Sequence, residues 1–379
     1  MTGVRFRTRE IGSLAKPAWR VKALAGRPLE GRDIEEAARW GRRLELGDHD
    51  RLLELLRRDE LDAAGRASVV DWSARYGLAL LERAGLDVVY DGEQRRSEMY
   101  DHAVRHASGF SARGSVRAFD DKYFTKAAVV EQPRLETPDV DEYRFVSAHA
   151  VGEVKVPLTG PYTIVDWSYD ERYDGGRRLG APAAERTAAR RRFALDTAGS
   201  LVGPNAAALA AAGAHWIQID EPAAAAKPHE TPLMVEAVNL ALHGLAVRRS
   251  IHVCFSDYRS LWPAVLELEH CHELQLEFAN RDSRSPGTRA EDRPGYAEVL
   301  PLFRAEGSPR VGLGVLDVHT DFVEPAELVR DRILYATGVL APDRIEVNPD
   351  CGLRTRSWDV AYEKLARMVE GTRLAEAAL

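Results

Sequence analysis

The sequence predicts an α/β fold, a single (β/α)8 TIM barrel with extended loops after its first and second strands. Short apolar runs that end in polar or glycine residues recur along the chain, and helical patterns lie between most of them. The chain has 379 residues, which is long enough for one such barrel. An open doubly wound sheet would produce the same alternation and is the alternative.

The predicted elements follow one another in a regular order. The eight predicted strands are Phe6–Ser13, Asp87–Glu93, Glu153–Gly160, Trp216–Glu221, Ser250–Phe255, Glu273–Asn280, Arg310–Asp317 and Arg344–Cys351. The clearest helical patterns are Trp72–Ala84, Thr187–Ala212 and Pro325–Thr337. We find no repeat with a period of 20–50 residues.

Two connections are longer than minimal strand-to-helix loops. Leu24–Asp71 carries helical patterns, and His102–Val151 contains a hairpin-like piece at Phe110–Val130. Long loops at the carboxyl ends of barrel strands commonly build substrate sites. Because no linker divides the chain, we expect one domain over residues 1–379, with residues 102–151 as a loop and hairpin insertion.

Composition excludes several classes of protein. The 52 basic and 59 acidic residues give a formal charge of 52 − 59 = −7, which argues against a nucleic-acid binder. No apolar stretch approaches the length of a membrane span, and the N-terminus is charged where a signal peptide is apolar. Three cysteines cannot form a disulfide framework. We therefore expect a cytoplasmic protein that binds neither nucleic acid nor membrane.

A set of metal-ligand side chains lies at predicted strand ends. His252 and Cys254 are two residues apart on one strand, so both point to the same face. Glu277 ends the next strand and Cys351 the last. In a barrel these ends meet at one rim, where the four side chains would form a tetrahedral zinc site with one exchangeable oxygen ligand. A structural zinc, or no metal, is the alternative.

Such a site suits sulfur chemistry. Zinc lowers the pKa of a bound thiol, which makes a substrate thiolate available as a nucleophile at neutral pH. The predicted reaction is therefore alkyl transfer to sulfur, because hydrolytic zinc sites more often use His and carboxylate ligands. Cys271, flanked by His270 and His272, precedes its strand and is expected to stand outside the site.

Other strand ends also carry polar groups. They are Gly12-Ser13, Glu93, Asp220-Glu221-Pro222 and Asp317-x-His319. Each alone could be a cap or turn residue, but together they are typical of a barrel active site. The pair Gly312-x-Gly314 lacks a third glycine and lies inside a strand, so we reject a dinucleotide-binding motif.

At these positions the sequence resembles the cobalamin-independent methionine synthase family, specifically its C-terminal catalytic barrel. The matching segments are REIGSL (9–14), DGEQRRSEM (91–99), PLTGPYTIVDWSYD (157–170), WIQIDEPA (216–223), IHVCFSDY (251–258), VGLGVLDVH (311–319) and VNPDCGLRTR (347–356). They occur in the family's order and cover nearly the whole chain. Long members have two barrels, so this chain is similar to the short single-barrel "core" branch.

The resemblance implies a role for each matching residue. Zinc would be bound by His252, Cys254, Glu277 and Cys351. Ile11, Gly12 and Ser13 would hold the carboxylate of homocysteine, and Asp220 its ammonium group. Trp167 matches the residue that stacks on the pterin of methyltetrahydrofolate. His319, paired with Asp317, matches the proton donor to the folate nitrogen, which leaves poorly unless it is protonated.

The chain also departs from the family pattern. The family continues its second motif as M-V-E-Y-F, with the Glu on the homocysteine ammonium group, whereas this chain has Asp101 there, in Met99-Tyr100-Asp101-His102-Ala103. The acceptor is then homocysteine held differently, or another thiol. The donor is methyltetrahydrofolate or a methylcorrinoid such as methylcobalamin, the latter on a corrinoid or accessory protein.

Two alternatives to a methionine-forming enzyme stay open. One is a related zinc-thiol alkyltransferase or lyase that acts on another thiol. The other is a partner-dependent or non-enzymatic barrel.

Overall fold

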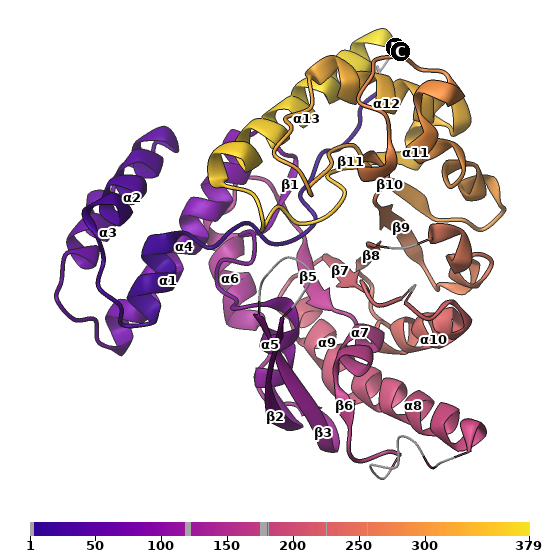
Figure 1. Cartoon of the computed structure of the whole chain (residues 1–379), viewed down its shortest axis with the longest axis horizontal. Helices are drawn as coiled ribbons and strands as arrows, with labels where there is room; N and C mark the ends of the chain where they lie inside the picture. The colour runs from indigo at the N-terminus through magenta and orange to yellow at the C-terminus, as the bar shows by residue number, and fades with distance from the viewer. Residues whose placement is uncertain (1–3, 118–122, 175–179, 181, 225, 256) are drawn as a thin grey trace.

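A six-stranded parallel sheet lies at the centre of the computed structural model, with helices packed around it (Figure 1). The structure describes residues 4–117, 123–174, 180, 182–224, 226–255 and 257–379. The strands are β1 (Val88–Val89), β2 (Ala107–Arg117), β3 (Tyr123–Leu135), β4 (Glu153–Val154), β5 (Val156–Thr159), β6 (Tyr169–Asp170), β7 (Trp216–Asp220), β8 (Arg248–Val253), β9 (Cys271–Leu276), β10 (Arg310–Gly314) and β11 (Ile345–Asn348).

Helices follow most of these strands, as the alternation in the sequence predicts. They are α1 (Ala18–Leu24), α2 (Gly31–Arg43), α3 (Asp50–Leu56), α4 (Ala63–Arg83), α5 (Met99–Arg105), α6 (Val140–His149), α7 (Pro161–Trp167), α8 (Ala183–Thr197), the π-helix η1 (Ala198–Val202), α9 (Gly203–Ala211), α10 (Thr231–Ala241), α11 (Pro294–Ala297), α12 (Ala326–Val339) and α13 (Trp358–Ala378). The predicted helix Thr187–Ala212 is divided by η1 between α8 and α9. Within the described residues, no helix has both the length and the apolar character of a membrane span.

Parallel pairing extends beyond the central sheet. That sheet has the order β11-β10-β9-β8-β7-β5, and β1 pairs with β4 in a separate two-stranded sheet. Isolated parallel bridges join Thr8 to Val347 of β11 and Arg9 to Val88 of β1. The predicted strand Phe6–Ser13 is present only as these bridges, because the Thr8 N–H is taken by the Asp87 carboxylate at 2.9 Å instead of a strand carbonyl.

Alternation along the strands separates an apolar layer from a polar one. In β7, Ile217 and Ile219 are buried among apolar side chains, while Gln218 and Asp220 point the other way and bond to one another at 2.6 Å. The register of β7 against β8 pairs Asp220 with His252. Successive polar residues therefore line the inner face of the sheet and lead to its carboxyl edge.

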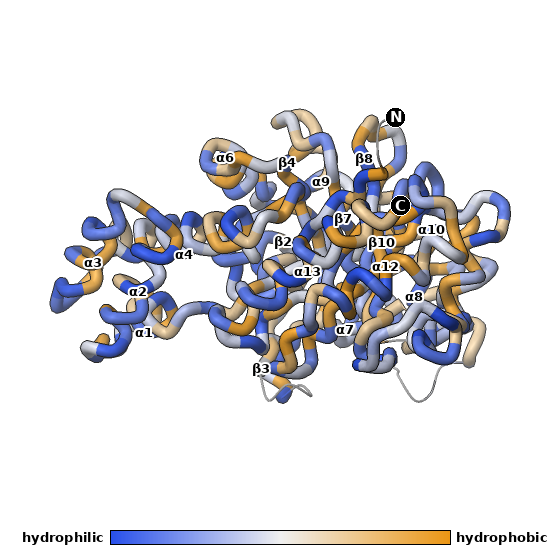
Figure 2. The backbone as a smooth tube through the Cα atoms, turned by 90° about the horizontal axis from the view of Figure 1, so that it is seen from above, coloured by the Kyte–Doolittle hydropathy of each residue, from blue (hydrophilic) through white to orange (hydrophobic). Residues whose placement is uncertain are grey.

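The two long connections form structured additions. β2 and β3 pair antiparallel and contain the predicted hairpin Phe110–Val130; the part of that prediction at 118–122 lies outside the described residues. Helices α2 and α3 and the start of α4 occupy the predicted helical stretch Leu24–Asp71. With α1 they form an arm at one end of the molecule, apart from the sheet (Figures 1 and 2).

Candidate active site

Three of the four predicted metal ligands converge at the carboxyl edge of the sheet. His252 lies near the end of β8, Cys254 follows that strand, and Cys351 follows β11. One ligand atom from each lies within 4.8 Å of the other two. Strand alternation brings His252 and Cys254 to the same face, and parallel order brings the Cys351 loop to the same edge.

The electrostatics of these three residues suit a soft divalent cation. A hydrogen bond with the Cys254 thiol lowers the pKa of Cys351 to about 5, and the same contact together with burial raises the pKa of Cys254 well above its ordinary value. His252 Nδ1 lies 3.3 Å from the Gln275 carbonyl, and the buried Nε2 has no hydrogen-bond partner among the described residues. An unsatisfied imidazole nitrogen beside a thiolate fits the donor set that zinc prefers.

Glu277 lies beside this group but is held mainly by hydrogen bonds. Its Oε2 accepts from the Phe255 N–H at 2.9 Å, the Tyr258 hydroxyl at 3.0 Å and Asn280 Nδ2 at 3.1 Å. Burial opposes ionisation, but the bonds from His319 and the Phe255 N–H lower the pKa of Glu277. Glu277 is therefore an ionised carboxylate adjoining the thiols, outside the 4.8 Å group.

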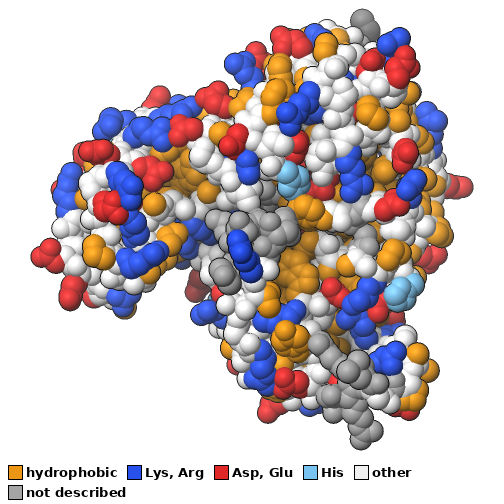
Figure 3. All heavy atoms as spheres, in the orientation of Figure 1, with side chains coloured by type: hydrophobic (Ala, Val, Ile, Leu, Met, Phe, Trp, Pro, Cys, Tyr) orange, Lys and Arg blue, Asp and Glu red, His pale blue; other side chains and the backbone are white. Residues whose placement is uncertain are grey.

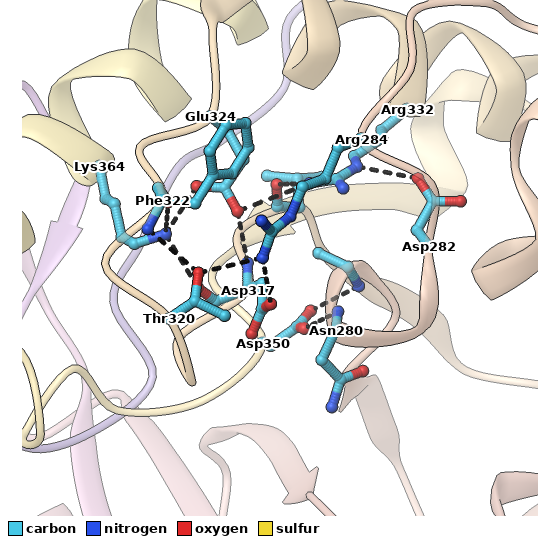
Figure 4. Close-up of polar contacts among 12 residues, drawn as sticks. Asn280, Asp282, Arg284, Asp317, Thr320, Phe322, Glu324, Arg332, Asp350 and Lys364 are labelled. Atoms are coloured by element: carbon cyan, nitrogen blue, oxygen red, sulfur yellow. Dashed lines mark hydrogen bonds and ion pairs between the residues drawn. The ribbon is translucent and has the colours of Figure 1, made fainter.

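Asp350 ties the two ligand-bearing loops together, a role that the sequence did not reveal. Its fully buried carboxylate accepts the N–H groups of Phe278, Ala279 and Asn280 at 2.9, 3.0 and 2.7 Å. The loop after Glu277 is thereby bound to the residue before Cys351 (Figure 4). This contact sets the spacing between the β9 and β11 ends.

Asp317 and His319 have separate tasks. Asp317 Oδ1 accepts the backbone N–H of His319 at 2.9 Å, so it shapes the turn and does not bond to the imidazole. Glu324 and Lys364 hold the backbone of Asp317 in turn, at 2.8 and 2.9 Å (Figure 4). The imidazole Nε2 of His319 instead lies 3.2 Å from Glu277 Oε1, and this bond raises the pKa of His319.

The segment Ile11–Ser13 borders the same site. Gln218 Nε2 donates both to the Ile11 carbonyl at 2.7 Å and to Asp220 Oδ1 at 2.6 Å, which couples that segment to Asp220. Gly352, next to Cys351, packs so closely that an added Cβ would lie 2.9 Å from the Ser13 nitrogen. Burial raises the pKa of Asp220 to about 7.

Glu93 contacts the Ile11–Ser13 segment, whereas the described contacts of Asp101 lie elsewhere. The sequence indicated Glu93 only as a polar residue at a strand end. A Cβ on Gly12 would lie 3.5 Å from Glu93 Oε1, and the charge of Glu93 acts on Asp220. Asp101 is buried on α5, where it bonds to Ser97 and, at 2.7 Å, to Arg105 Nε. The described contacts thus bring Glu93, and not Asp101, to the Ile11–Ser13 segment.

Trp167 ends α7, whose start is anchored to the strand end that carries Asp220. Glu221 accepts the N–H groups of Tyr162 and Thr163 at 3.0 and 2.7 Å. The approach is so close that a side chain on Gly160 would overlap Glu221, with a Cβ 2.1 Å from its Cδ.

Two aromatic side chains, Tyr100 and Phe124, lie near Trp167. Its ring lies 6.2 Å from that of Tyr100 and 6.4 Å from that of Phe124, with the Arg354 guanidinium 4.7 Å from the Phe124 ring. Figure 3 shows hydrophobic side chains gathered near the centre of the face in view, with basic side chains around them.

The sequence is similar to those of known proteins. Residues 50–374 match the model of the cobalamin-independent synthase catalytic domain. The chain is 35% identical over 305 residues to a methionine synthase of Thermoplasma acidophilum, covering 78% of this chain and 86% of that protein. It is 36% identical over 294 residues to a methionine synthase of Pyrococcus furiosus, covering 77% and 78%.

A solved structure shows the same fold. It is a B12-independent methionine synthase from Shewanella sp. W3-18-1 in complex with selenomethionine, with a TM-score of 0.73 and 22% identity over 99% of this chain and 98% of that chain. Together with the family model, which spans most of the sequence, these matches give the assignment. The chain belongs to the cobalamin-independent methionine synthase family and carries its catalytic domain.

Proposed function

We propose that this protein is a zinc-dependent methyltransferase that methylates the thiol of homocysteine to give methionine. The observation that carries the proposal is the convergence of His252, Cys254 and Cys351 within 4.8 Å in a chain of this family. Bound Zn²⁺ would lower the pKa of the acceptor thiol, so that it is present as a thiolate at neutral pH. Glu277 adjoins the three residues as the fourth, exchangeable ligand.

The acceptor amino acid is recognised beside the metal ligands. Asp220 and Glu93 supply negative charge for the ammonium group. Asp101 instead pairs with Arg105 on the same helix, α5, and stabilises that helix. Ile11, Gly12 and Ser13 bind the carboxylate in this proposal, which the approach of Gly352, next to Cys351, to Ser13 and of Glu93 to Gly12 supports. The related Shewanella protein holds selenomethionine, an amino acid of the product's shape, which supports a site of this kind.

His319 supplies the proton that the donor's leaving nitrogen needs. In the reaction the acceptor sulfur forms a bond to the methyl carbon, and the carbon–nitrogen bond breaks with its electron pair going to nitrogen. The bond to Glu277 raises the pKa of His319 and so favours its protonated form. Asp317 fixes the turn that presents His319, and Trp167 forms the surface for the donor's ring system.

The fold that supports this chemistry is a (β/α)8 barrel, and residues 1–379 form it as one domain. The bridges from Thr8 and Arg9 link β11 to β1, and β4 runs into β5 through Lys155. These contacts support a ring in which every strand has parallel neighbours. The β2–β3 hairpin, within residues 102–151, is an insertion at its carboxyl end.

A methylation assay tests the function. The zinc-loaded enzyme is incubated with homocysteine and either methyltetrahydrofolate or methylcobalamin, and methionine is measured. We expect turnover with one of the two donors, and in Cys351→Ser the loss of turnover and of the zinc ion bound by the cysteines. A zinc-loaded enzyme that methylates other thiols but not homocysteine would contradict the acceptor assignment.

A further inference from the structure

A second group of metal-ligand side chains lies on α5 and the loop before α6, apart from the cysteines. His102 and His106 are four residues apart, so their rings lie on the same face, with centroids 4.1 Å apart. Asp139 Oδ1 lies 2.8 Å from His102 Nε2 and 3.2 Å from His106 Nδ1. One ligand atom of each lies within 4.8 Å of the other two.

These distances are close to those of a bound metal ion. In a tetrahedral zinc site with nitrogen and oxygen ligands at about 2.0–2.2 Å, neighbouring ligand atoms are about 3.3–3.6 Å apart. The two nitrogen–oxygen distances here, 2.8 and 3.2 Å, are about 0.1–0.8 Å shorter than that range. A metal ion could replace the protons between Asp139 Oδ1 and the two imidazole nitrogens if the rings of His102 and His106 moved by less than about 1 Å.

The surroundings support the group as ligands. Asn205 Nδ2 donates to Asp139 Oδ2 at 2.9 Å, which leaves Oδ1 toward the histidines. Such outer contacts commonly orient metal ligands. Arg96 lies 3.9 Å from Asp139, and its charge is paired at 2.7 Å with Glu142.

A small cavity adjoins the group. It has a volume of about 20 Å³ and is lined by both histidines, Asp139, Arg96, Thr159, Asn205 and apolar side chains. A space of roughly 10–15 Å³ accommodates one water molecule. The cavity can therefore hold a fourth, solvent ligand but no substrate.

We propose that His102, His106 and Asp139 bind a second divalent transition-metal ion of the zinc type, independent of the cysteine site. The ion has a positioning role. It joins α5 to the loop before α6, and α5 carries Tyr100, whose ring lies against Trp167. The His106 carbonyl also accepts the N–H groups of Glu136 and Thr137, so the base of the β2–β3 hairpin is tied to the same point.

Metal analysis of purified full-length protein tests the proposal. The double variant His102→Gln/His106→Asn keeps a donor at each ring-nitrogen position but removes the imidazole ligands. After loading with ZnCl₂ and gel filtration, we expect two equivalents of zinc in the wild type and one in this variant. Cys254→Ser/Cys351→Ser should also retain one, which shows that the two sites fill separately.

The matched control is His149→Gln on α6, where an exposed histidine bonds only to the Phe145 carbonyl among its described hydrogen bonds. It should keep both equivalents. Titration of the metal-free wild type with CoCl₂ adds a readout that needs no variant. One equivalent should produce a thiolate-to-cobalt charge-transfer band, and the other only weak visible bands.

The proposal is overturned if the wild type binds one equivalent that vanishes in Cys254→Ser/Cys351→Ser, or if His102→Gln/His106→Asn binds as much zinc as the wild type. Failure to methylate homocysteine, or failure of the cysteine site to hold zinc, would leave the equivalent that is lost in His102→Gln/His106→Asn unchanged. The two proposals can therefore fail separately.

Discussion

Asp350→Asn is the sharpest test of how the metal site is assembled. The three N–H groups that Asp350 accepts, from Phe278, Ala279 and Asn280, hold the β9 loop against the β11 loop. An Asn carbonyl can replace Oδ1 and keep two of these bonds. Its NH₂ group must then face the Asn280 N–H, which Oδ2 now accepts at 2.7 Å.

The expected loss of stability comes from the hydrogen bond between the Asn280 N–H and Asp350 Oδ2. Burial raises the pKa of Asp350 to about 8, so the carboxylate is charged only above that pH. Hydrogen bonds to charged groups contribute about 1.5–3 kcal/mol, so at a pH above 8 losing one should lower the free energy of unfolding of the metal-free protein by that amount. Because the loops that carry Glu277 and Cys351 lose a contact, zinc affinity should also fall, by about 10–100-fold as for other residues that orient metal ligands.

Two measurements check the prediction. Urea unfolding of the metal-free protein gives the stability, and competition with a chromophoric chelator gives the zinc affinity. The control is Asp331→Asn on α12, where a buried carboxylate accepts the Gly287 N–H at 2.8 Å. It should lose stability but keep its zinc affinity. If Asp350→Asn loses stability and its zinc affinity equals that of the control, the reasoning about the coupled loops is wrong.

Three further substitutions test the substrate contacts. Because the pKa of Asp220 is raised to about 7, methionine, which has no thiol, should bind more tightly as the pH rises through about 7 and the carboxylate ionises. In a calorimetric titration, Asp220→Asn should abolish this rise in methionine affinity and weaken binding about ten-fold or more. If the affinity of the variant still rises with pH, the assignment of Asp220 is wrong. His319→Asn should slow folate-dependent turnover by about 10²–10⁴-fold and leave zinc content intact. With methylcobalamin, whose leaving group needs no proton, it should have little effect; equal losses with both donors would refute the proton-transfer role. Glu221→Gln should raise KM for the methyl donor more than it lowers kcat, because α7 and Trp167 lose their anchor; unchanged kinetics would show that Trp167 is held by other contacts.

The sequence alone predicted the later strands and three residues of the candidate metal site. Runs with alternating apolar residues predicted β7 to β11 within a few residues, because one face of each strand packs in the apolar layer. The spacing of His252 and Cys254 placed both on one face, since side chains alternate strictly along a strand. These features depend on neighbours in the chain, and local periodicity reports them directly.

Only the tertiary structure decided how side chains from distant segments meet. The bond from His319 to Glu277, the three N–H groups on Asp350 and the contact of Glu93 with Gly12 join residues between 42 and 81 positions apart. The family pattern pointed to Asp101 for the acceptor, but an arginine one helical turn away holds it. A hydrogen bond depends on distance and angle in space, and periodicity along the chain sets only the face on which a side chain lies.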